Sequence, residues 1–185
     1  MVPLAMLWAP IVLSAVIVFI ASSIMHMVLP YHQSDCRRLP DEDNLRAALR
    51  TAGVSRGLYM FPYSSHKDMK SPAMQEKFKE GPVGTMTVFA SGPPALPKFL
   101  AMWFVYCLII GFFTAYLTGH TVAPGVNYLV VFRVAGTAAF MSYGLGLLSN
   151  GIWKGQPWGM TIKEVIDGLV YGLLTAGTFG WLWPR

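Results

Sequence analysis

The chain has 185 residues, of which 54% are apolar and 12% charged, and a formal net charge of +5. Soluble domains carry roughly 25% charged residues, so this composition excludes an ordinary soluble domain and predicts a multi-pass membrane protein. The basic residues gather where a membrane topology would place them, so we do not expect nucleic acid as a partner.

Four apolar stretches predict helices that cross a hydrocarbon core of about 30 Å, a length that takes about 20 residues each. They cover residues 4–27, 98–118, 126–148 and 162–183. No Lys or Arg precedes the first stretch, and the stretch is longer than the apolar region of a signal peptide, so we expect an uncleaved anchor. The predicted fold is an all-α membrane protein with four transmembrane helices and a small α/β cap between the first two.

Residues 31–97 predict two helix-strand units in series. Acidic residues 41–43 open a helix that Gly53 can end, and residues 58–61 form a short strand. Ser71 and Pro72 open the second helix, and a second strand follows at residues 85–89. The expected domains are therefore a first transmembrane helix (1–30), a basic cap (31–97) and a three-helix membrane bundle (98–185).

The distribution of basic residues predicts the orientation in the membrane. The segment after the first span, together with Lys98, carries ten Lys and Arg, and Lys154 lies in the turn between spans three and four. The opposite face carries only the terminal Arg185. Cytoplasmic loops are enriched in Lys and Arg, so we expect the cap in the cytoplasm and both termini outside it, in the inner membrane if the protein is bacterial.

Metal ligation is one hypothesis for the end of the first span. Imidazole binds Zn, Cu and Fe, and two histidines lie there close to residues that could complete a ligand shell. The candidate ligands are His26, His32, Asp35, Cys36 and His66. The alternative is a belt of interfacial side chains among lipid headgroups, with no cofactor bound, because the spacing matches no compact metal motif.

Polar residues inside the third and fourth spans are the second set of candidates. Arg133 either faces the bundle interior with a partner or extends to the headgroups. Asp167 and Tyr171 could join it in a polar track, although Arg133 and Asp167 differ by about 12 Å in depth. Glu164 has a simpler explanation, because Thr161 and Glu164 form a capping-box pattern at a helix start.

Small residues follow one face of each of the later spans. Gly168 and Gly172 on the fourth, and Cys107, Gly111 and Ala115 on the second, predict close packing between helices. Cys36 and Cys107 are placed too far apart to pair, so we expect two free thiols.

Signatures of catalysis are absent from the sequence, which has no G-x-S-x-G elbow, P-loop or CxxC motif. The sequence favours a non-enzymatic accessory, assembly or structural subunit that contacts the lipid bilayer and a membrane protein partner or second copy. The alternative is a small oligomeric transporter or proton- or ion-conducting protein, with a transition metal (Cu or Zn) at its cytoplasmic interface.

Overall fold

A computed structural model describes all residues of the chain, 1–185. The protein is mostly helical and divides into two compact units. The first unit comprises Met1–Asp35 together with Ala95–Arg185, and the second comprises Cys36–Pro94. These limits lie within a few residues of the ends predicted for the cap.

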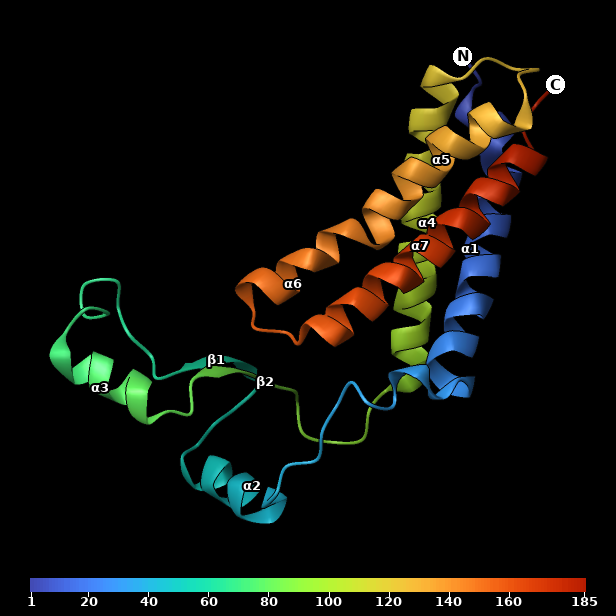
Figure 1. Cartoon of the computed structure of the whole chain (residues 1–185). Helices are drawn as coiled ribbons and strands as arrows, with labels where there is room; N and C mark the ends of the chain where they lie inside the picture. Colours follow the sequence, from blue (N-terminus) through green and yellow to red (C-terminus); the bar gives the residue numbers. More distant parts are fainter. The chain divides into compact units, whose positions relative to one another are not determined.

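The first unit is a bundle of long helices (Figure 1). Its amino-terminal segment contains η1 (Leu4–Leu7), α1 (Trp8–Ser23), η2 (Ile24–Val28) and η3 (Pro30–His32). Its carboxyl-terminal segment contains α4 (Leu96–Thr121), α5 (Tyr128–Tyr143), η4 (Leu145–Leu147), α6 (Leu148–Trp153) and α7 (Trp158–Trp181). The chain termini lie at the same end of this unit, and α6 and the first turns of α7 lean away from α4 at the other end (Figure 1).

Three helical segments are long and apolar enough to cross a membrane: Leu4–Val28, Leu96–Thr121 and Tyr128–Trp153. They correspond to the first three predicted spans, and they indicate an integral membrane protein. The helix α7 has 24 residues but is not among the three. Its first half carries Lys163, Glu164 and Asp167, which lower its mean hydropathy, so the fourth span stays a prediction.

Glycines on α7 let this helix approach α5 closely. A Cβ on Gly168 would lie 2.6 Å from the backbone nitrogen of Gly144, and one on Gly172 would lie 3.0 Å from Phe140 Cβ. On α4, a Cβ on Gly119 would lie 2.7 Å from the carbonyl oxygen of Val2. Such distances leave no room for a side chain, so the predicted close packing through small residues is confirmed.

The start of α7 differs from the sequence-based prediction. The helix begins at Trp158, directly after Pro157, rather than at residue 162. The Thr161 hydroxyl donates to the Pro157 carbonyl at 3.3 Å, and the Glu164 carboxylate accepts from the Gln156 amide at 2.7 Å. The capping-box interpretation is therefore wrong, because Pro157 presets a helix start one turn earlier.

The second unit contains α2 (Glu42–Thr51), β1 (Gly57–Phe61), α3 (Pro72–Glu80) and β2 (Gly84–Val88). The strands form an antiparallel pair with Leu58 opposite Thr87, and the Ser71 hydroxyl caps α3 by accepting from Met74 N at 3.3 Å. The predicted order of elements is thus correct. No residue of this unit is buried, so it has no hydrophobic core of its own.

Candidate metal centre

Two histidines and an aspartate lie together in the first unit, where α1 ends. His26, His32 and Asp167 each present one ligand atom, and these atoms lie within 4.8 Å of one another. The sequence predicted the two histidines as metal ligands and Asp167 as an intramembrane polar group. The structure brings residues of these two sets into a single cluster.

The local backbone explains how the histidines meet. The last turn of α1 widens into a π-helical turn over Ile24–Val28 that contains His26, and Pro30 then starts a 3-10 turn that ends at His32. Single π turns within helices occur frequently at functional sites. As a result, the His26 and His32 rings stack with centroids 4.2 Å apart and planes inclined by 10°. Because Pro30 interrupts the helix between His26 and His32, helical periodicity could not predict that the two rings meet.

Hydrogen bonds fix which nitrogen of each ring is free. The Nδ1 of His26 donates to the Ser22 carbonyl at 3.0 Å, and the Nδ1 of His32 donates to Asp35 Oδ2 at 2.6 Å. A neutral imidazole that donates through Nδ1 keeps a lone pair on Nε2. Both histidines therefore have an Nε2 that is free to bind a metal ion, and an orienting partner on the other nitrogen is the usual arrangement for metal-bound histidine.

The Asp167 carboxylate is buried and faces both free nitrogens. Its Oδ2 lies 2.8 Å from His32 Nε2 and 3.9 Å from His26 Nε2, and its side chain is 4% exposed. Both Asp167 oxygens and His32 Nε2 lack a hydrogen bond of good geometry, although Oδ2 and Nε2 are close enough to share a proton. Buried polar groups are rarely left unsatisfied. Either a proton shared between Nε2 and Oδ2 or a bound cation would satisfy these atoms.

A lysine from α7 holds the loop that carries His32 and Asp35. The Lys163 ammonium donates to Asp35 Oδ1 at 2.7 Å, to the Tyr31 carbonyl at 2.8 Å and to Ser34 Oγ at 2.9 Å. These bonds use all three of its donors. Hydrogen bonds from Lys163 and then His32 hold the pKa of the Asp35 carboxyl below its usual value, so Asp35 is ionised and keeps the proton on His32 Nδ1.

The three donor atoms fit a divalent transition metal ion that keeps one coordination position free of protein ligands. Two imidazoles and a carboxylate are ligands of Zn²⁺ at about 2.0–2.2 Å, and three protein ligands with a free position are typical of catalytic rather than structural zinc. Ligands of a tetrahedral ion at these distances lie about 3.4 Å apart. The most separated atoms must therefore approach one another, which rotation of the half-exposed His26 ring can provide.

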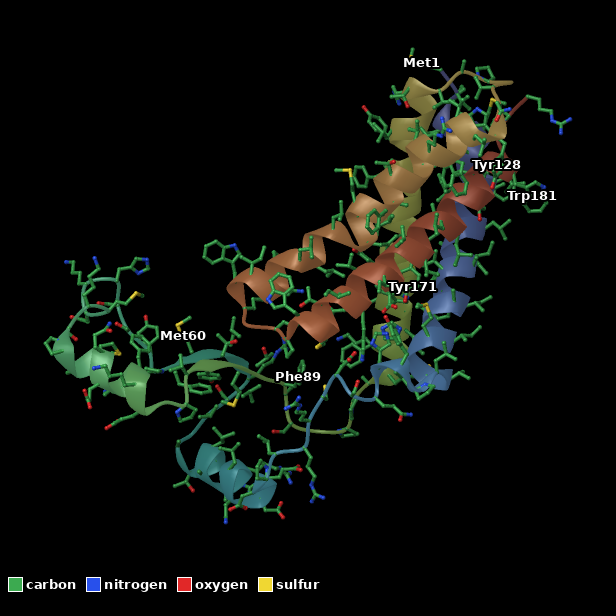
Figure 2. All side chains as sticks on the ribbon, viewed as in Figure 1. Met1, Met60, Phe89, Tyr128, Tyr171 and Trp181 are labelled. Carbon is green, nitrogen blue, oxygen red and sulfur yellow. The ribbon has the colours of Figure 1, made fainter.

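A cavity of about 460 Å³ opens beside the cluster. Helices α1, α4, α5 and α7 all contribute to its wall, which includes His26, Asp167, Trp103 and Tyr171. Tyr171, labelled in Figure 2, lies in the middle of the bundle, with its ring 6.2 Å from the Trp103 ring of α4. The Tyr171 hydroxyl is buried and has no hydrogen-bond partner.

The remaining predicted residues are not part of the cluster. Asp35 binds the far nitrogen of His32 instead of presenting an oxygen to the shared point. Cys36 is exposed, and both Cys36 and His66 belong to the second unit. Arg133 is exposed and forms no direct ion pair with Asp167, so the polar track between them stays a prediction.

Sequence reasoning missed Lys163 and Ser22 as supporting residues. Lys163 lies between Thr161 and Glu164, the two residues that matched a capping pattern, so it was assigned no role of its own. A lysine one turn before a buried aspartate on an otherwise apolar helix would have been the available indication, because intramembrane charges usually pair.

Comparison of the chain with protein-family models, curated proteins and solved structures gives no match.

Proposed function

We propose that this chain is a multi-pass membrane protein that binds one divalent transition metal ion through His26, His32 and Asp167. The observation that carries the proposal is the buried Asp167 carboxylate beside two imidazoles whose Nδ1 atoms are both held by hydrogen bonds, so that each Nε2 faces Asp167. The nitrogen and oxygen donors favour Zn²⁺ or a similar divalent ion over Cu(I), which prefers sulfur ligands.

Metal content tests this proposal directly. Protein purified in detergent without a histidine-rich tag, exposed to Zn²⁺ and dialysed, is expected to retain about one ion per chain. Asp167→Asn keeps the size of the side chain but removes the charge and one oxygen donor, so we expect affinity to fall at least about 100-fold. Elemental analysis and competition with a chelator of known affinity measure both quantities.

His66→Ala is the matched control, because His66 lies in the second unit and is not a member of the cluster. It should retain the ion with unchanged affinity. Equal zinc retention by wild type and Asp167→Asn, or loss of zinc in His66→Ala, would contradict the assignment.

We further propose the topology indicated by the basic residues, with α7 as a fourth span, the second unit in the cytoplasm and both termini outside. Support comes from the length of α7, since 24 residues of helix extend about 36 Å. Further support comes from the ten Lys and Arg that precede and include Lys98.

Cysteine labelling tests the sidedness. Cys36 is exposed and Cys107 is buried, so a membrane-impermeant maleimide should modify one site only. We expect labelling in inverted vesicles and none in intact cells, measured by the mass shift of the protein, with Cys36→Ser as the unreactive control. Labelling of Cys36 in intact cells would place the second unit on the other side.

A second candidate function is proton transfer, because His32 lies between two carboxylates, Asp35 and Asp167, at 2.6 and 2.8 Å. This function would require proton flux through the reconstituted protein without metal, and flux that stops in His32→Ala. The third ligand atom favours the metal site, because His26 joins His32 and Asp167 with all three ligand atoms within 4.8 Å of one another. An accessory role in a larger complex is compatible with either function and stays a proposal.

A further inference from the structure

The cavity beside the cluster has one polar end and apolar walls. His26 and Asp167 lie at the polar end, and the Tyr171 hydroxyl adds a buried donor without a partner. On the side of α4, Leu96, Phe99 and Leu100 line the cavity. Cavities of 300–1,000 Å³ with mostly apolar walls and a few convergent polar groups are the usual form of small-molecule sites.

The position of the wall residues indicates where a ligand would come from. Leu96 and Phe99 line the cavity, yet their side chains are 50% and 53% exposed. Each of them therefore has one side toward the cavity and another toward the outer surface of α4. The helix α4 is one of the three that can cross a membrane. With α4 in a membrane, its exposed apolar residues would face lipid, and a molecule dissolved in lipid could reach the cavity without crossing water.

The charge at the polar end of the cavity determines which kind of ligand head group can bind there. Without metal, the carboxylates of Asp167 and Glu164 in the cavity wall would repel an anion. A divalent ion on His26, His32 and Asp167 supplies a positive charge and a free coordination position, which an oxygen donor can fill. Tyr171 can donate a hydrogen bond to the same head group.

We propose that the cavity binds a fatty acid, with its carboxylate at the open side of the metal and the Tyr171 hydroxyl, and its chain along Leu96, Phe99 and Leu100 of α4. The proposal rests on the proposed metal site. In this proposal the metal ion binds the head group of an amphiphile from the membrane, in addition to linking the helices that supply its ligands.

A photoactivatable palmitate analogue tests the proposal in phosphatidylcholine nanodiscs that contain the full chain. We expect a cross-linked adduct in zinc-loaded wild type, and at least a ten-fold lower yield after chelation. Leu100→Trp fills the cavity from α4, a helix that supplies no ligand, and should lower the yield by a similar factor while zinc content stays unchanged. Leu117→Trp on the same helix, outside the cavity, is the matched control and should label as wild type does.

Metal analysis of each sample separates the possible failures. Zinc-loaded protein that gives no adduct, or an adduct of equal yield without zinc or in Leu100→Trp, overturns the fatty acid assignment and leaves the metal site intact. Protein that retains no zinc overturns both. Preferential labelling by an analogue with an amine head group would show that the cavity selects cations, which also overturns the assignment.

Discussion

Gly168→Ala is expected to destabilise the bundle by about 1–3 kcal/mol, as overpacking of a tightly packed site commonly does. A methyl group at this position would lie 2.6 Å from Gly144 N and 2.8 Å from Tyr143 C, and both are backbone atoms that cannot rotate away. The helices α5 and α7 must therefore separate. The free energy of unfolding in mixed detergent micelles, followed by circular dichroism, measures the effect.

Gly159→Ala is the matched control on the same helix. A Cβ there meets no atom within 4 Å, and alanine is a better helix former than glycine by about 1 kcal/mol. This variant should be as stable as wild type or more stable. Equal stability of Gly168→Ala and wild type would contradict the close packing of α5 and α7.

Lys163→Met is expected to weaken metal binding about 10–100-fold, the usual cost of losing a residue that orients a ligand. The change keeps most of the apolar stem but removes the ammonium that binds Asp35, Ser34 and the Tyr31 carbonyl. His32 then loses the loop that fixes its orientation. Zinc affinity by chelator competition measures the effect.

Lys154→Met is the control for this prediction, since Lys154 is exposed and forms no ion pair. It removes the same charge from a nearby part of the chain without touching the loop. If both lysine variants bind zinc as wild type does, Lys163 does not support the site.

The sequence predicted helices and strands well because their signals are local. Prolines and glycines at segment ends, the Ser71 cap and long apolar runs each act within a few residues. The start of α7 was misplaced because a capping pattern at Thr161 competed with Pro157, and Pro157 begins the helix.

The sequence predicted only part of the site, because the rest depends on contacts between residues that are distant in the chain. His26 and His32 could be selected by residue type, but their stacking depends on a π turn that no periodicity indicates. Asp167 is distant in sequence and could be assigned to the same site only once α1 and α7 were packed together. For Arg133 the sequence left two alternatives, a partner inside the bundle or extension to the headgroups, and the residue is exposed on α5.

X-ray absorption at the zinc edge tests the central claim most directly, because it reports the atoms around the ion in the loaded full chain. The account predicts two imidazoles and oxygen ligands at about 2.0–2.2 Å, with one imidazole lost in His26→Ala. A first shell that contains sulfur at about 2.3 Å, or one without imidazole, would contradict the metal site formed by His26, His32 and Asp167.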